Sequence, residues 1–162
     1  MIKILFICHG NICRSPIAEF YMKDYVTRKG ISDQFEIASA ATTTEEIWGG
    51  KGNPIYPPAM QELLSHGIGT RDNELGVQKK RARLMTRADY DKYDYIIGMD
   101  SENLHDMKRI AGGDPEGKIS LLLDYTDHPG NVADPWYTRN FKATWNDVAE
   151  GVTGFMEKLG KE

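Results

Sequence analysis

Residues 2–18 have the sequence IKILFICHGNICRSPIA, and this stretch decides the fold. An apolar run at residues 4–7 ends at Cys8, and a short polar segment leads to Ser15 and Pro16, where helix-forming residues begin. This order predicts a strand, a tight loop and a helix. Backbone N–H groups and the helix dipole converge on a loop of this kind, so it can bind an oxyanion. The loop also carries a thiol, Cys8, and a permanent positive charge, Arg14.

The bulk composition is that of an ordinary globular chain. It has 162 residues, of which 40% are apolar and 27% are charged, so we expect one domain spanning residues 1–162. A net charge of −4 argues against a nucleic-acid partner. No apolar run reaches transmembrane length, and the apolar N-terminus is too short for a signal peptide. We therefore expect a cytoplasmic protein without membrane association.

Both cysteines, Cys8 and Cys13, lie in the same short loop. A structural disulfide framework would spread its cysteines along the chain, so that role is disfavoured. The four histidines are scattered, so no set of ligands has the spacing of a zinc site. Reactive thiols in a reducing compartment are the better interpretation.

The rest of the chain alternates between strand and helix patterns. Strands are expected at residues 3–8, 35–39, 93–99 and 118–123, with a brief one at 83–85. Ser15 is expected to cap the first helix, with Pro16 at its first position. Later helices are expected at 58–67, after a Thr86 cap, at 101–111 after an Asp100 cap, and at 138–158. Residues 42–58 are expected to form a long surface loop. This order predicts an α/β fold, a parallel sheet covered by helices on both faces, with ligands bound beyond the carboxyl ends of the strands, where Cys8 lies.

The residues of the first loop suit the hydrolysis of a phosphate monoester. That reaction needs N–H donors around three equatorial oxygens, a cation, a nucleophile and an acid for the leaving group. Gly10 would let the backbone approach the ligand, and Arg14 would offer a planar fork of donors to two oxygens. The same donors should favour the thiolate form of Cys8. Asn11 would hold the loop, and Ser15 would donate to the Cys8 sulfur.

The segment Cys8-His-Gly-Asn-Ile-Cys-Arg-Ser-Pro16 resembles the signature of the low-molecular-weight protein tyrosine phosphatases. The resemblance continues through Ser39-Ala-Ala-Thr42, Tyr93-Asp-Tyr-Ile96 and Asp134-Pro-Trp-Tyr137 in the order of that family. It implies a single-domain three-layer sandwich with a four-stranded parallel sheet (phosphotyrosine phosphatase I-like). It also implies no metal or cofactor and a phosphocysteine intermediate on Cys8.

The resemblance further implies roles for residues far from the loop. Asp134 is similar to the family's general acid, which protonates the leaving phenolate and then activates water, although the residues alone favour an Asx-turn before Pro135. Substrate-binding positions would be His9, Gly10, Asn11, Ile12, Cys13, Trp48, Trp136 and Tyr137, the three aromatic residues walling the pocket. The implied activity is hydrolysis of phosphotyrosine in proteins and of small aryl phosphates. The implied partner is a protein substrate that carries phosphotyrosine. We expect a monomer, with a weak dimer as the alternative.

Two departures from the family pattern concern the support behind the loop. Ala41 stands where the family usually has Gly. The family's network histidine is replaced by Lys80 or a neighbour, and Ser39 is expected to stay in the network with partners that the sequence does not identify.

Several alternatives stay open at this point. A thioredoxin-coupled arsenate reductase would need further cysteines, and none follows Cys13. An arginine-phosphate phosphatase would tend to carry Thr at the position of Ile12, and a non-catalytic phosphate-binding module would lack Cys8, Arg14 or Asp134. Cys13 itself is either a small buried residue or a redox guard that forms a reversible disulfide with Cys8.

Overall fold

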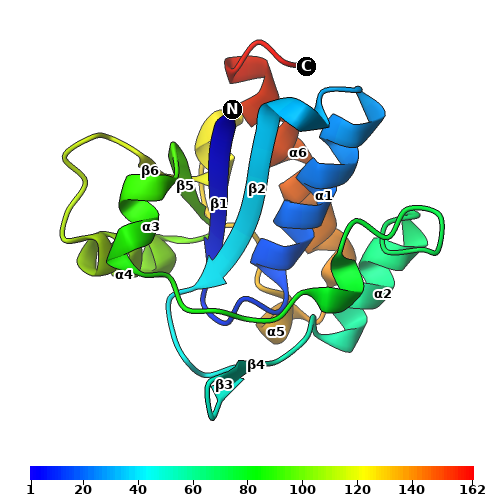
Figure 1. The fold of residues 1–162 in the computed structure, drawn as a ribbon, viewed down its shortest axis with the longest axis horizontal. Helices are drawn as coiled ribbons and strands as arrows, with labels where there is room; N and C mark the ends of the chain where they lie inside the picture. Colours follow the sequence, from blue (N-terminus) through cyan, green and yellow to red (C-terminus); the bar gives the residue numbers. More distant parts are fainter.

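The chain is built around a four-stranded parallel sheet, and the computed structural model describes all of residues 1–162. The strand order is β2 (Phe35–Ala41), β1 (Ile2–Cys8), β5 (Tyr95–Gly98) and β6 (Ile119–Leu121). Strand β1 thus has a neighbour on each side, with Cys8 level with Ala41 and Ile7 level with Gly98. The predicted parallel sheet is confirmed, and Figure 1 shows β1 beside β2.

Helices cover both faces of this sheet. One side carries α1 (Arg14–Arg28), α2 (Pro57–Ser65) and α6 (Phe141–Lys158), and the other carries α3 (Arg87–Lys92) and α4 (Ser101–Ala111), as Figure 1 shows. The arrangement is the expected three-layer α/β sandwich. None of these helices combines the length and the apolar character needed to span a bilayer.

The alternation of side chains along β1 divides the core into two parts. Ile4, Phe6 and Cys8 point into a cluster of 27 buried residues shared with α1 and α6. Leu5 and Ile7 point the other way, into a cluster of 10. Residues 4–7 are all fully buried, as expected of a central parallel strand covered on both faces. Cys8 therefore lies on the same side of the sheet as α1.

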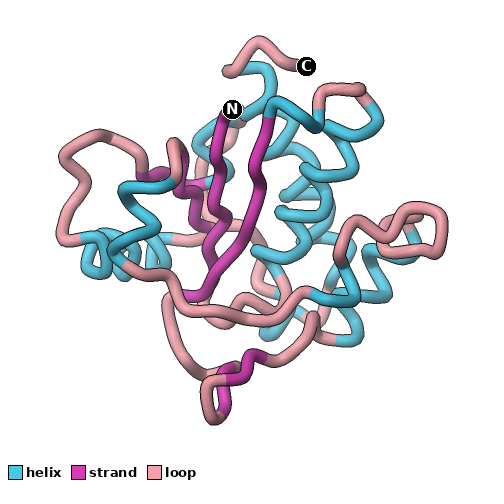
Figure 2. The backbone as a smooth tube through the Cα atoms, in the orientation of Figure 1, coloured by secondary structure: helices cyan, strands magenta, loops and turns pink.

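Loops gather at the carboxyl end of the sheet, as the tube in Figure 2 shows. The expected loop at 42–58 contains a small hairpin, β3 (Ile47–Trp48) with β4 (Lys51–Gly52), closed by two glycines of positive φ. Such a pair of residues suits a tight hairpin turn. The short helix α5 (Pro135–Thr138) also lies at this end.

Three local expectations were wrong. Helix α1 begins at Arg14 with Cys13 at its N-cap, because the Ser15 hydroxyl is fully buried and directed at Cys8 instead of at the helix N-terminus. The helix expected at 138–158 begins later, because Arg139 has the left-handed φ of 59° and ends the short helix before it. Helix α6 then begins at Phe141, after the cap Asn140. Residues 83–85 contribute one isolated bridge between Ala41 and Leu84 and no strand.

Candidate active site

Cys8 occupies the end of β1 and is almost completely buried. Its sulfur is approached by the Ser15 hydroxyl at 3.0 Å and by the Asn11 backbone N–H at 3.3 Å. The Asn11 N–H belongs to the loop that wraps around the sulfur, and Ser15 belongs to the first turn of α1.

Asn11 holds the loop together. Its side-chain N–H groups donate to Ser15 Oγ at 2.8 Å and to Ser39 Oγ at 2.9 Å, and its Oδ1 accepts from the backbone N–H of Arg83 at 3.2 Å. Asn11 also has φ 61°, the left-handed conformation that Asn tolerates better than most residues. The sharp inward turn of the loop is therefore at Asn11.

Gly10 contributes space rather than an unusual backbone angle. A Cβ at this position would lie 3.2 Å from the side chain of Glu46. The absence of a side chain thus lets the segment after β2 approach the loop closely.

Arg14 is held between two carboxylates from distant parts of the chain. Its Nη1 donates to Asp100 Oδ2 at 2.7 Å, and its Nη2 lies 3.4 Å from Asp134 Oδ2. Burial of the guanidinium opposes its charge, but Cys8, Asp100 and Asp134 outweigh that penalty, so the pKa of Arg14 is raised. Arg14 is therefore a permanent cation beside the Cys8 sulfur.

The Asp134 carboxylate both caps a short helix and lies beside Arg14. One oxygen accepts from the backbone N–H of Trp136 at 3.0 Å and so caps α5, as an Asx-turn before Pro135 would. The other oxygen faces Arg14. Its side chain is 29% exposed, so the carboxyl group is open to a substrate that enters from solvent.

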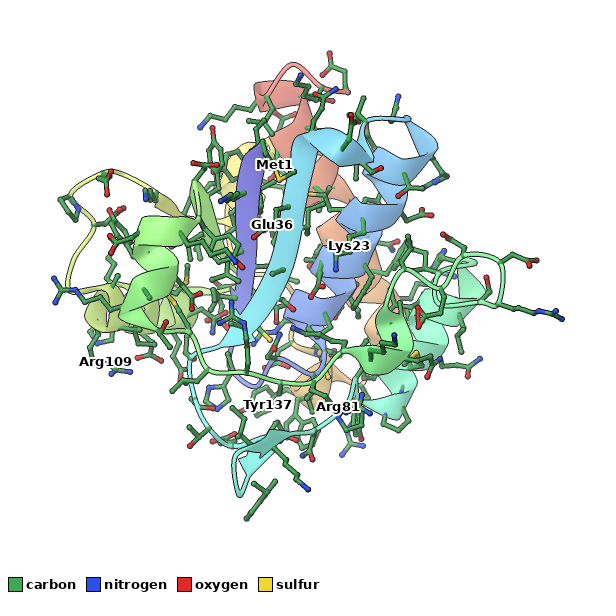
Figure 3. All side chains as sticks on the ribbon, viewed as in Figure 1. Met1, Lys23, Glu36, Arg81, Arg109 and Tyr137 are labelled. Atoms are coloured by element: carbon green, nitrogen blue, oxygen red, sulfur yellow. The ribbon has the colours of Figure 1, made fainter.

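These groups share one cavity of about 620 Å³. Its lining includes most of the expected site residues, namely Cys8, His9, Gly10, Ile12, Cys13, Arg14, Asp134, Trp136 and Tyr137. At its mouth His9 Nε2 lies 2.9 Å from Glu45 Oε2. Figure 3 shows Tyr137 at the end of the molecule where the β3–β4 hairpin lies. Asn11, Ser15 and Ser39 are not in the lining but lie behind it.

Trp48 is not part of this lining, so the expected third aromatic wall is absent. Its side chain, in the short strand β3, is 72% exposed, while the preceding Ile47 is partly buried against the core. Successive residues of a strand point to opposite sides, which turns Trp48 outward. Glu45 and Glu46 line the cavity instead.

Cys13 lies in the cavity wall and is largely buried. Burial, the neighbouring Cys8 sulfur and the Asp134 carboxylate raise the pKa of the Cys13 thiol. Cys13 is therefore a protonated thiol at neutral pH.

The hydrogen-bond network behind the Cys8 loop contains Lys80, and the family's network histidine is missing. Lys80 Nζ donates to the Ser39 carbonyl at 2.8 Å and lies 3.5 Å from Glu19 Oε1. The Ser39 hydroxyl donates to the same Glu19 oxygen. Lys80 thus occupies the network, as the sequence suggested, while the carboxylate of Glu19 was not expected there.

Asp100 is another site residue that the sequence reasoning missed, because it was interpreted only as the cap of α4. It does cap α4, accepting from Asn103 N–H at 2.7 Å, but its second oxygen binds Arg14. A signal was available: Asp100 follows β5, which we expected beside the other strands, and carboxyl ends of parallel strands meet at one edge.

The chain is similar to known proteins over nearly its whole length. The sequence model of the family described as "Low molecular weight phosphotyrosine protein phosphatase" matches residues 3–162. The chain is 35% identical over 164 residues to the low molecular weight protein-tyrosine-phosphatase YfkJ of Bacillus subtilis, covering 100% of this chain and 98% of that protein.

Solved structures agree with this match. The crystal structure of YfkJ superposes with a TM-score of 0.88 at 32% identity, covering 99% of this chain and 96% of that one. A low molecular weight protein tyrosine phosphatase from Streptococcus pyogenes gives 0.82 at 36% identity, with 98% and 93% covered. The structure named DARP, drosophila arginine phosphatase, gives 0.82 at 26% identity, with 98% of each chain covered.

Proposed function

Because the chain belongs to the low molecular weight phosphotyrosine protein phosphatase family and is a protein-tyrosine phosphatase, we propose that it hydrolyses phosphotyrosine through a covalent phosphocysteine on Cys8. The observation that carries this mechanism is the setting of Cys8. Its sulfur accepts from the Asn11 N–H, lies 3.0 Å from the Ser15 hydroxyl, and opens on a cavity that also holds Arg14 and Asp134.

In the first step the Cys8 thiolate attacks phosphorus in line with the departing phenolate oxygen. The S–P bond forms as the P–O bond breaks, and Asp134, as the acid, transfers its proton to the phenolate oxygen. Arg14 leaves Asp134 to bind two equatorial oxygens of the phosphoryl group, while Asp100 keeps the other side of the guanidinium in place. Asp134 is then a carboxylate, ready for the second step.

In the second step water hydrolyses the phosphocysteine. Asp134 takes a proton from the water molecule, the oxygen attacks phosphorus, and the S–P bond breaks to return the Cys8 thiolate and release inorganic phosphate. The Ser15 hydroxyl stabilises the sulfur as leaving group, just as it stabilised the nucleophile, because it can donate to the developing charge.

The substrate-binding part of the proposal assigns the entrance to aromatic and apolar side chains. Trp136 packs against Tyr56 with ring centres 5.3 Å apart, and Trp136, Tyr137 and Ile12 all line the cavity. A flat phenyl ring fits such walls better than a short serine side chain. His9 and Glu45 at the mouth are proposed to contact residues that flank the phosphotyrosine.

The test compares wild type with Cys8→Ser and Asp134→Ala on para-nitrophenyl phosphate. We expect turnover by wild type, none by Cys8→Ser, and a fall in kcat of at least about a hundredfold in Asp134→Ala. A phosphoenzyme trapped by rapid acid quench should carry phosphate on Cys8. Full activity in Cys8→Ser would contradict the mechanism.

A phosphoarginine substrate is the second candidate. It is favoured by the carboxylates of Glu45, Glu46 and Asp134 in the lining, which could pair with a guanidinium, and by the structural likeness to a protein named an arginine phosphatase. The apolar side chain of Ile12 in the lining favours the aromatic substrate. Peptides of one sequence carrying phosphotyrosine, phosphoserine or phosphoarginine distinguish these candidates by their kcat/KM values.

A further inference from the structure

Behind the Cys8 loop lies a buried pair of opposite charges, Lys80 and Glu19. Their side chains are 11% and 5% exposed, and Lys80 Nζ lies 3.5 Å from Glu19 Oε1. The other Glu19 oxygen accepts from Lys23 at 2.6 Å, and Figure 3 shows Lys23 on α1. Burying a carboxylate is costly unless cations and hydrogen-bond donors compensate it, and here two ammonium groups and a hydroxyl do so.

The pair is the first member of a chain of hydrogen bonds that ends at the nucleophile. An ionised carboxylate can only accept, so the Ser39 hydroxyl must donate to Glu19. The Ser39 oxygen is then free to accept from the Asn11 side-chain amide at 2.9 Å. The carboxylate thus determines which way the first two hydrogen bonds of the chain run.

The Asn11 side-chain amide connects these hydrogen bonds to the Cys8 loop. Its Oδ1 accepts from the Arg83 N–H, so both of its N–H groups are left to donate, one to Ser39 and one to Ser15. Ser15 accepts that bond and has a single proton, which is directed to the Cys8 sulfur at 3.0 Å. Ser15 and Asn11 are at most 1% exposed, so water does not compete for these bonds.

We infer that Lys80 is a positioning residue for Cys8. By pairing with the buried Glu19 carboxylate that accepts from Ser39, Lys80 maintains the direction of the hydrogen-bond chain and leaves the Ser15 hydroxyl donating to the sulfur. Without the carboxylate, Ser39 no longer needs to accept from Asn11, the amide can turn over, and Ser15 would then donate to the amide oxygen. The inference rests on the proposed role of Cys8 as the nucleophile.

The charges around Lys80 fit this role. Burial lowers the pKa of Lys80, Glu19 opposes that effect, and the cations Arg83 and Lys23 add to it. Glu19 is thus the anion that stabilises the Lys80 ammonium, while the Arg83 guanidinium is itself paired with Asp89 at 3.0 Å. The hydrogen bond from Lys80 to the Ser39 carbonyl also ties the 80–83 segment to β2.

The test measures alkylation of Cys8 by iodoacetamide as a function of pH, with the labelled cysteine identified by mass spectrometry. The variants are Lys80→Met, Glu19→Gln, the double variant, and Lys80→Arg, which keeps the charge. Lys79→Met is the matched control, because Lys79 is the adjacent lysine and is exposed. Alkylation requires no turnover, so its result does not depend on whether the protein hydrolyses a given phosphate ester.

We expect Lys80→Met to move the pH midpoint of alkylation upward and to slow the reaction at pH 6 by up to about tenfold, since one pH unit corresponds to a tenfold change. The kcat for para-nitrophenyl phosphate should fall with KM changed by less than about twofold. Lys80→Arg and Lys79→Met should stay close to wild type. In the Glu19→Gln background, Lys80→Met should have no further effect, because Lys80 acts through Glu19.

Two outcomes would overturn the inference. One is a Lys80→Met protein that alkylates as wild type does at every pH. The other is a Lys80→Met effect of the same size with and without Glu19→Gln, which would mean that Lys80 acts independently of the carboxylate. If Lys80→Met does not fold, Lys80→Gln takes its place under the same criteria.

Discussion

Arg14 and Asp100 form an ion pair that joins the ends of the two central strands, with Arg14 Nη1 2.7 Å from Asp100 Oδ2. Arg14 is the first residue of α1, directly after the loop that follows β1, and Asp100 comes after Met99 beyond the end of β5. Asp100 holds one side of the guanidinium, so the other side is presented to the cavity where Asp134 lies. A planar fork held in this way is oriented before a phosphate arrives, which lowers the entropic cost of binding it.

Asp100→Asn should therefore lower kcat/KM on aryl phosphates by about tenfold, the effect of weakening one charge-assisted hydrogen bond. Asn remains a good helix cap, so α4 should keep its N-terminus. Asp100→Ala, which loses the cap as well, should be less stable than Asp100→Asn by about 1 kcal/mol in urea unfolding. Equal activity in Asp100→Asn and wild type would show that the ion pair does not orient Arg14.

Asn11 combines a left-handed backbone with four hydrogen bonds, so its substitutions should separate the two contributions. Asn11→Gly accepts φ 61° without strain but removes the side-chain bonds to Ser15, Ser39 and the Arg83 N–H, and we expect it to lose about 2 kcal/mol of stability. Asn11→Ala should lose about 1 kcal/mol more, because Ala is strained in that conformation. Chemical denaturation measures both, and an Ala variant as stable as the Gly variant would contradict the backbone argument.

The two exposed tryptophans should differ in their effect on substrate binding. Trp136 lines the cavity and packs on Tyr56, so Trp136→Ala should raise KM for para-nitrophenyl phosphate by about tenfold through lost aromatic contact. Trp48 lies outside the lining, and Trp48→Ala should change that KM by less than about twofold. Steady-state kinetics on para-nitrophenyl phosphate measures both KM values. A large effect of Trp48→Ala would show that Trp48 contacts the substrate.

Cys13 should make stability fall at alkaline pH. Burial and the nearby Cys8 sulfur raise the pKa of the folded thiol above its ordinary value of 9.0, so the folded state keeps a proton that the unfolded state releases. This contribution is fully present below pH 9 and decreases as the pH rises above it. Cys13→Ser should flatten the decline in unfolding free energy between pH 8 and pH 10. Parallel curves for the two proteins would refute the assignment.

The sequence predicted the central layer of the fold well, because its signals there are local. The apolar run at 4–7 ends in polar residues, which is how a central parallel strand meets a loop, and the caps Asp100 and Thr86 stand before the helices that they begin. Boundaries were less accurate where a side chain served a distant partner. Serine commonly caps helices, yet the Ser15 hydroxyl forms hydrogen bonds with Cys8 and Asn11 instead.

The sequence by itself determined the order of elements, the placing of Cys8 at a strand end, and the family. These depend on neighbouring residues and on a motif that lies within one loop. Only the tertiary structure decided that Arg14 pairs with Asp100, that Lys80 and Glu19 stand behind Ser39, and that Trp48 faces solvent. The physical reason is the same for all three. The register of the parallel strands and the course of long connections bring distant residues together, and hydrophobicity patterns along the chain do not encode which distant side chains then meet.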